Sequence, residues 1–520
     1  MIDWLAGALD RLASSATGLC RVPLSNAPSN AGTRSGRRSG RAARALLVLL
    51  ATVATLAPFA RAQQNLPDMG EPADNALPPL EEERLGAELM RQIRTALPLV
   101  RDVQLEEYIQ TLGMRLALAS GKTGGRPFTF FLIDDETINA FAIPGGYVGI
   151  NAGLIGAMQR EEQLASVLAH EVAHVTQRHH ARAFATGRSS SLSAAAAVLA
   201  AILIGQASPE AGQAALAAGI AATQQSAINF TRGNEIEADR IGIEILGNAS
   251  YDARAMAEAF AILRRQNSLN TTGSGLEYLR THPLDNNRIA EAADRALARP
   301  ALPPVSQTDF AVFKARLAVL TTEDPAQLER AYRAIVDPGG GSAEVGARYG
   351  LALLALRANR LDEALVELER LDELAPAHPT VELLRTDALE AKGEVRDSRE
   401  RLAALSELYP EHYSIVEKRV EQLTRARRVE EALDVVQRYV RSAEAPDPLA
   451  WRQLAGIRQR LGDEVGSHES LARYFAALDE LQRAEDQLEL ALRQVPPASQ
   501  DELRLQAELK ALREEAVRRR

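Results

Sequence analysis

Residues 170–174 read His170-Glu171-Val172-Ala173-His174 and continue an apolar segment, 164–169, which favours a buried helix. On an α-helix, residues i and i+4 lie one turn apart on the same face, so both imidazoles can bind one metal ion. Glu171 then lies beside the metal, where its carboxylate can take a proton from a water molecule that attacks a peptide carbonyl. The alternative is a surface helix that carries two histidines by accident, but the chain has only 8 His among 520 residues. The segment therefore predicts the active-site helix of a zinc peptidase.

A later segment, 234–242, supplies candidates for the third metal ligand that a catalytic zinc site requires. Glu235 and Asp239 are four residues apart and share one helix face, whereas Glu237 points elsewhere. With Glu235 at the metal, Asp239 can accept the outer N–H of a ligand histidine and fix the tautomer of that imidazole. The alternative is an ordinary solvated acidic face. The HExxH motif upstream favours the metal site.

HExxH followed by ExxxD resembles the signature of the minigluzincin-type zinc peptidases, which include the HtpX and CAAX prenyl protease families. Segments 139–146 and 281–284, together with Arg288, also resemble motifs of that family. A catalytic domain followed by helical repeats resembles its periplasmic BepA type in particular. The resemblance implies a site that binds one Zn²⁺. Its residues would be His170, His174 and Glu235 as ligands, Glu171 as general base and Asp239 as support for a ligand.

Four further polar residues lie near these motifs: His282, Arg288, His179 and His180. His282 precedes Pro283, so its backbone is restricted to an extended conformation, typical of an ordinary loop. The resemblance instead implies that His282 reaches the active site, either as a catalytic donor to the oxyanion or as an occupant of the open zinc position that keeps the enzyme latent. Arg288 is predicted to support the same loop or to bind the substrate backbone. His179 and His180 lie beyond the two ligands and are expected to face solvent.

The chain before the HExxH helix alternates between helical and extended patterns. Segments 81–94 and 104–118 have apolar residues at helical spacing, and 128–133 reads as a strand. Segment 138–150, with Pro144-Gly145-Gly146 at its centre, predicts a hairpin beside the active-site helix. An extended substrate can add to the edge of such a sheet. We expect Asn139, Ala140 and Phe141 to bind substrate there, the alternative being that they only pack under the helix.

The first 62 residues have the pattern of a secretory signal peptide, with arginines, an apolar core at 45–57 and a cleavage site near Ala62. An uncleaved membrane anchor is the alternative. The only cysteine, Cys20, lies in this leader, so the mature chain needs no disulfides, and we place it in the periplasm of a Gram-negative bacterium. A second apolar stretch, 192–222, is too short in its longest run to span a membrane. It predicts a helical hairpin that acts as a lid, packs in the core or makes peripheral membrane contact.

The C-terminal part of the chain has an internal period of 34 residues, which is typical of tetratricopeptide repeats. Pro376 and Pro410 are separated by this period, and small and large packing positions recur with it. These positions are Ala364, Ser398 and Ala432, and Leu368, Leu402 and Val436. The period predicts three units over 345–446, a further unit over 468–496 and a closing helix over 500–518. A generic helical bundle is the alternative.

These patterns predict a mainly α protein, in which an α+β zincin-like peptidase domain with a small sheet precedes an α-solenoid. The expected domains are a signal peptide (1–62), a linker (63–80), the peptidase (81–304) and the repeats (305–520). The net charge of −9, with both signs mixed along the chain, gives no indication of nucleic-acid binding.

The predicted function is that of a periplasmic zinc endopeptidase. Resemblance to the BepA type implies unfolded or misassembled outer-membrane proteins as substrates, and the barrel-assembly machinery as a partner of the repeats. The alternative is a chaperone or adaptor of outer-membrane protein assembly in which zinc is structural. An intact Glu171 argues against that alternative, because a structural site needs no base.

Overall fold

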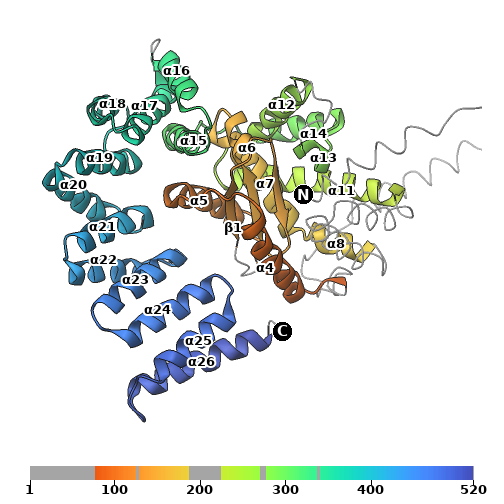
Figure 1. The fold of residues 1–520 in the computed structure, drawn as a ribbon. Helices are drawn as coiled ribbons and strands as arrows, with labels where there is room; N and C mark the ends of the chain where they lie inside the picture. Colours follow the sequence, from red (N-terminus) through yellow and green to blue (C-terminus); the bar gives the residue numbers. More distant parts are fainter. Residues whose placement is uncertain (1–75, 124–127, 187–223, 270–276, 337–339, 519–520) are drawn as a thin grey trace, which may run out of the picture.

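The computed structural model describes residues 76–123, 128–186, 224–269, 277–336 and 340–518 (Figure 1). The N-terminal part is a helical domain around a small sheet. Its elements are α4 (Pro79–Ala96), α5 (Val103–Ala119), β1 (Thr129–Ile133), β2 (Ala140–Ile143), β3 (Tyr147–Asn151), α6 (Ala152–Ala157), α7 (Glu161–Thr176), α8 (His179–Thr186), α11 (Gln224–Asn248), α12 (Arg254–Leu269), α13 (Glu277–Thr281) and α14 (Asn286–Leu297).

The C-terminal part consists of helices that stack in antiparallel pairs into an arc (Figure 1). They are α15 (Thr308–Thr321), α16 (Pro325–Val336), α17 (Gly341–Arg357), α18 (Leu361–Leu374), α19 (Pro379–Lys392), α20 (Val395–Leu408), α21 (Tyr413–Arg425), α22 (Val429–Ser442), α23 (Pro448–Arg460), α24 (Glu464–Ala477), α25 (Leu481–Leu492) and α26 (Gln500–Arg518). The predicted fold class is confirmed.

The sheet has the order β1-β3-β2, with β1 parallel and β2 antiparallel to β3. The predicted hairpin is therefore confirmed, and its turn contains Gly145 and Gly146 with φ of 83° and 86°, which glycine adopts without strain. Alternate side chains face opposite sides: Phe131 and Ile143 pack on α4, and Ala140 belongs to the core that includes α5 and α7. β2 is thus an edge strand that lies against the metal-site helix.

Helices α7 and α11 cross closely in the core of the N-terminal domain. Almost all of α7 is buried, consistent with the apolar and small residues on most of its faces. A methyl group added at Gly242 of α11 would lie 3.3 Å from the backbone nitrogen of His170. The glycine therefore lets the two helix backbones approach at the point where the ligands of the predicted site meet.

Helix α15 joins the two parts of the protein because it contributes to both cores. Phe310 and Phe313 pack in the N-terminal core, whereas Val312 and Val319 pack with the first repeat. The predicted domain boundary at 304/305 stays a prediction, since the packing is continuous across α15.

The repeat positions predicted from the 34-residue period are buried between the helices of each pair. Their exposed fractions are 0% at Ala364, Ser398, Ala432, Leu368, Leu402 and Val436. Gly393 ends α19 with φ of 91°, as its place in a turn requires. The expected unit over 468–496 is wrong: His468 lies inside α24, and the pair that follows the three predicted units is α23 and α24. The repeat pattern is degenerate there, so a single period could not place the boundary.

The solenoid curves around α5 and its last helices lie near α4 (Figure 1). Asp102, which caps α5, forms a bidentate ion pair with Arg316 of α15 at 2.7 and 2.8 Å. Glu107 of α5 accepts bonds from the backbone nitrogens of Tyr413 and Ser414 at the start of α21. Part of the concave surface of the solenoid is therefore occupied by the protein's own N-terminal domain.

Two predicted segments lie outside the described residues: the signal peptide over 1–62, with most of the linker that follows it, and the apolar stretch 192–222. Their roles stay predictions. Among the helices that the structure describes, none is both long enough and apolar enough to cross a membrane.

Gly86 of α4 provides a test of the packing that supports the hairpin. A methyl group at Gly86 would lie 2.0 Å from the carbonyl oxygen of Pro144. We expect Gly86→Ala to lower the unfolding free energy by about 1–3 kcal/mol, because two backbone segments must separate. The measurement is the midpoint of thermal unfolding. Gly156→Ala is the control, since a methyl group there has no neighbour within 4 Å; an equal effect of both substitutions would contradict the packing described.

Candidate metal centre

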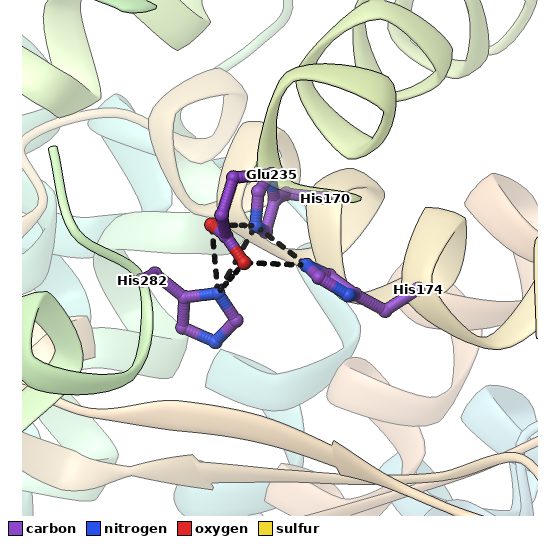
Figure 2. Close-up of side chains that lie close together, drawn as sticks. All are labelled: His170, His174, Glu235 and His282. Atoms are coloured by element: carbon purple, nitrogen blue, oxygen red, sulfur yellow. Dashed lines mark hydrogen bonds and ion pairs between the residues drawn. The ribbon is translucent and has the colours of Figure 1, made fainter. Parts of the chain in front are cut away.

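The HExxH motif lies on α7, with its side chains directed into the protein. The exposed fractions are 1% for His170 and Glu171 and 8% for His174. α11 brings Glu235 to the same point, with an exposed fraction of 2%. Two segments that are far apart in the sequence thus place three predicted metal ligands in one buried cluster (Figure 2).

The donor atoms of the cluster have the spacing of zinc ligands. His170 Nε2 lies 3.0 Å from His174 Nε2 and 3.4 Å from Glu235 Oε2. His174 Nε2 lies 3.4 Å from Glu235 Oε1. Ligand atoms that bind a tetrahedral zinc at 2.0–2.1 Å are about 3.3 Å from one another. Two neutral imidazoles and a carboxylate are also the donor types that catalytic zinc uses, so these residues fit the ion.

His282 contributes a fourth donor atom to the cluster. It follows α13, and its Nδ1 lies 3.3 Å from His170 Nε2 and 3.1 Å from both carboxylate oxygens of Glu235 (Figure 2). Its ring stacks on Tyr278 with 4.8 Å between centroids. His282 therefore reaches the cluster, as the resemblance implied, and its role as an oxyanion donor or as an occupant of the open zinc position stays a prediction.

Asp239 and Arg288 support the ligands from behind. Asp239 Oδ1 lies 3.0 Å from His170 Nδ1, the nitrogen that faces away from the cluster. Arg288 donates to both oxygens of Asp239 at 2.8 Å. Burial would raise the pKa of Asp239, but the bond from Arg288 has the opposite effect and the pKa is lowered overall. Asp239 is thus ionised and can accept the outer N–H of His170.

Arg288, predicted to support the loop of His282 or to bind substrate, is directed at groups of the protein itself. The exposed fraction of Arg288 is 3%, and its guanidinium contacts Asp239, Glu235 and the carbonyl oxygen of Pro283. A buried guanidinium needs such partners, because leaving it unpaired would cost several kcal/mol. Arg288 therefore supports the loop of His282, the other role that its position in the sequence suggested.

The two carboxylate oxygens of Glu171 have different surroundings, and only one of them accepts a hydrogen bond. Its Oε2 accepts a hydrogen bond from the backbone nitrogen of Ala142 at 3.1 Å. Its Oε1 is buried without a hydrogen-bond partner among the described residues and lies 3.6 Å from His282 Nε2. Burial raises the pKa of Glu171, which makes the carboxylate a stronger base. The free oxygen is the feature of a group that accepts a proton from outside the protein.

The predicted substrate strand is only partly available at the free edge of β2. The carbonyl of Asn139 accepts a bond from Asn151, so Asn139 and Phe141 direct their backbone groups towards β3. Ala140 and Ala142 direct theirs towards the open edge. Of the three predicted residues, only Ala140 has its backbone groups directed at that edge, and the neighbouring position Ala142 already donates its N–H to Glu171 and accepts a bond from His180. Substrate binding by Asn139, Ala140 and Phe141 stays a prediction.

His179 does not face solvent as expected. Its exposed fraction is 4%, and its Nδ1 lies 2.9 Å from His174 Nδ1. His180 is half-buried, also in contrast to the prediction. Both histidines are turned towards the protein because the chain changes direction at Arg178, which follows α7 and has φ of 53°. Helix α8 begins directly after this turn. The pattern His-x₄-His after the motif was visible in the sequence, but a continuous helix would have placed His179 on another face.

Comparison with known proteins agrees with this geometry. Residues 103–296 match Peptidase family M48. The beta-barrel assembly-enhancing protease of Escherichia coli (strain K12) is 34% identical, over 90% of this chain and 96% of the relative. The chain belongs to peptidase family M48. The resemblance to the HExxH minigluzincin type, with BepA-type architecture, is thereby confirmed.

Two further relatives extend the comparison. The beta-barrel assembly-enhancing protease of Yersinia pestis is 38% identical over 58% of this M48 peptidase and 62% of the relative. The mitochondrial metalloendopeptidase OMA1 of Schizosaccharomyces pombe is 31% identical over 35% of this chain and 50% of the relative. The M48 chain is thus a metalloendopeptidase, and the cluster of His170, His174, Glu235 and His282 is where it can hold its metal.

Proposed function

We propose that this M48 peptidase is a periplasmic zinc endopeptidase that cleaves misfolded or stalled envelope proteins during the assembly of outer-membrane β-barrel proteins. The observation that carries the chemistry is the buried oxygen of Glu171, which has no hydrogen-bond partner among the described residues, beside four metal-donor atoms. A relative that matches over nearly its whole length is named a beta-barrel assembly-enhancing protease, which supports the biological setting.

The roles of the residues follow from their positions. His170, His174 and Glu235 would hold one Zn²⁺ per chain, which would supply Lewis-acid activation of water and of the peptide carbonyl. Glu171 Oε1 accepts the proton of the attacking water and returns it to the leaving amine. Burial favours the neutral form of His174 by lowering its pKa, while Glu235 has a lowered pKa, because the neighbouring histidines outweigh the effect of burial.

The open edge of β2 is the proposed binding site for an extended peptide. Ala140 offers its backbone groups, and Asn139 and Phe141 hold the strand on β3. The bond from Ala142 to Glu171 links this edge directly to the general base. A peptide that pairs with β2 therefore lies beside both Glu171 and the metal ligands, with specificity left to the side-chain positions on either side of the scissile bond.

The partners and location of the chain belong to the same proposal. Segment 1–62 is a signal peptide cleaved near Ala62 in a Gram-negative bacterium, and 192–222 is a candidate for a lid, for core packing or for peripheral contact with the membrane. The solenoid docks on the barrel-assembly machinery, since helical repeats present extended surfaces for proteins. Unfolded or misassembled outer-membrane proteins are the substrates. The chain that remains after cleavage near Ala62 contains no cysteine, so it needs no disulfide in the oxidising periplasm.

An incubation of the zinc-loaded full chain with an unfolded outer-membrane β-barrel protein tests the proposal. We expect cleavage at internal peptide bonds, lost with a chelator and restored with zinc. The same protein folded into detergent micelles is the matched control and should remain intact, because its backbone is already paired in strands. Equal resistance of the unfolded form over hours would contradict the proposed function.

A chaperone or adaptor with a structural zinc is the second candidate, and one observation favours it. His282 completes a set of four protein donors, which is typical of structural zinc sites. The orphan oxygen of Glu171 favours the enzyme, with His282 as a fourth ligand that keeps it latent.

The variant His282→Ala separates these two candidates. We expect it to retain zinc and to hydrolyse a peptide faster, because the fourth ligand position becomes open to water. If nine chains in ten have His282 in that position, the rate rises about tenfold. Both zinc content and initial rate should be measured. His468→Ala in the solenoid is the control. Loss of zinc from the His282 variant would support the structural site, and loss of activity with zinc retained would make His282 an oxyanion donor.

A further inference from the structure

The outer nitrogen of His174 faces a second imidazole instead of a carboxylate. His174 directs Nε2 into the metal cluster, and its Nδ1 lies 2.9 Å from His179 Nδ1. The two rings are nearly perpendicular, with centroids 4.8 Å apart. His179 is the first residue of α8 and is as deeply buried as the ligands themselves. Its position is fixed by the turn at Arg178, which donates to Glu82 and to the carbonyl of Leu77.

The chain of contacts continues from His179 to α11. His179 Nε2 lies 3.3 Å from Glu237 Oε2, and the same oxygen accepts a bond from Arg182 Nη2 at 2.8 Å. Glu237 is two residues after Glu235 and therefore lies on a different face of α11. From that face it contacts His179. Arg182 lies three residues after His179 and so on the same face of α8.

Proton positions along this chain are determined by the metal site. A histidine that binds a metal through Nε2 keeps its proton on Nδ1, so His174 must donate to His179. His179 Nδ1 is then the acceptor, and its proton is on Nε2, directed at the carboxylate of Glu237. Only one tautomer of each ring satisfies both contacts.

The arrangement parallels the support of the other ligand histidine. His170 Nδ1 faces Asp239, whose carboxylate is fixed by Arg288. In each case a carboxylate paired with an arginine supports a ligand imidazole on its outer side. For His174, the ring of His179 lies between the ligand and that carboxylate. Such outer partners orient a ligand and raise its basicity.

We propose that His179 is a positioning residue for the metal ligand His174, and that Glu237 with Arg182 fixes the tautomer and orientation of His179. This inference rests on the proposed function, because it requires a metal at the cluster. It assigns a role to a histidine outside the HExxH and ExxxD motifs.

Zinc affinity of the full chain, measured by competition with a chromophoric chelator, tests the proposal. We expect His179→Phe to weaken zinc binding by about 10- to 100-fold, the usual effect of removing an outer partner. His179→Asn should bind more tightly than His179→Phe, because the amide oxygen can still accept the Nδ1–H of His174. The visible spectrum of the Co²⁺-substituted chain should shift with His179→Phe and less with His179→Asn. His468→Asn is the control.

Glu237→Gln is a second test that does not depend on folding of the phenylalanine variant. The side chain of Glu237 has an exposed fraction of 36%, so the amide is tolerated sterically. We expect a smaller but measurable loss of zinc affinity and a kcat that falls while KM is unchanged. If both His179→Phe and Glu237→Gln bind zinc as tightly as the parent chain, the inference about His179 is overturned, whereas the proposed function is not affected. Failure of the parent chain to bind zinc would overturn the proposed function as well.

Discussion

Glu171→Gln is expected to retain bound zinc and to lose between about 100- and 10,000-fold of kcat for peptide hydrolysis, the usual contribution of a general base. The amide has the shape of the carboxylate and can still accept the bond from Ala142, so the ligands are not disturbed. It cannot take a proton from water. The measurements are zinc content by atomic spectrometry and single-turnover cleavage of a peptide.

The matched control for this substitution is Glu136→Gln, which makes the same change at an exposed carboxylate. It should leave kcat unchanged. If Glu171→Gln cleaves at the rate of the parent with equal zinc content, Glu171 is not the base. If it loses zinc, the effect on kcat would have another cause, and the assignment of Glu171 would be contradicted as well.

Glu235→Ala is expected to weaken zinc binding by more than about 100-fold, because a ligand matters at least as much as the outer partners that orient it. Glu235 is buried and lies within 3.4 Å of the Nε2 atoms of both His170 and His174. Its removal also deprives Arg288 of one of its buried anionic partners. The zinc content after dialysis against a weak chelator is the direct measurement.

Glu244→Ala on the same helix is the control, since that side chain is exposed and faces away from the cluster. Retention of one zinc per chain by Glu235→Ala would place the third ligand elsewhere. The double variant Glu235→Ala with His282→Ala then shows whether His282 replaced the missing carboxylate.

The metal cluster was largely predictable because helical geometry converts sequence spacing into position. His170 and His174, four residues apart, must share a face of α7, and Glu235 and Asp239 share a face of α11 for the same reason. Likewise, the 34-residue period required each pair of repeat helices to bury the same positions, such as Ala364.

The parts that were not predicted depend on turns and on strand register. His179 reaches His174 only because Arg178 adopts a positive φ, which neither residue's identity indicated. Asn139 and Ala140 differ in whether their backbone groups can pair with a peptide, because successive residues direct these groups alternately to β3 and to the free edge. The hydrogen bond from Asn151 to Asn139 determines which residues face β3. The ion pair of Arg288 with Asp239 joins residues on different helices, so spacing could not show it.

We propose that one zinc ion at this cluster makes the protein a peptidase. Adding zinc in steps to the metal-free full chain, while the initial rate of peptide hydrolysis is measured, tests this requirement. We predict a rate that rises linearly and reaches its plateau at one zinc per chain. Hydrolysis by the metal-free chain at the full rate, or a zinc-loaded chain that remains inactive both with His282 present and with His282 replaced by alanine, would contradict the claim.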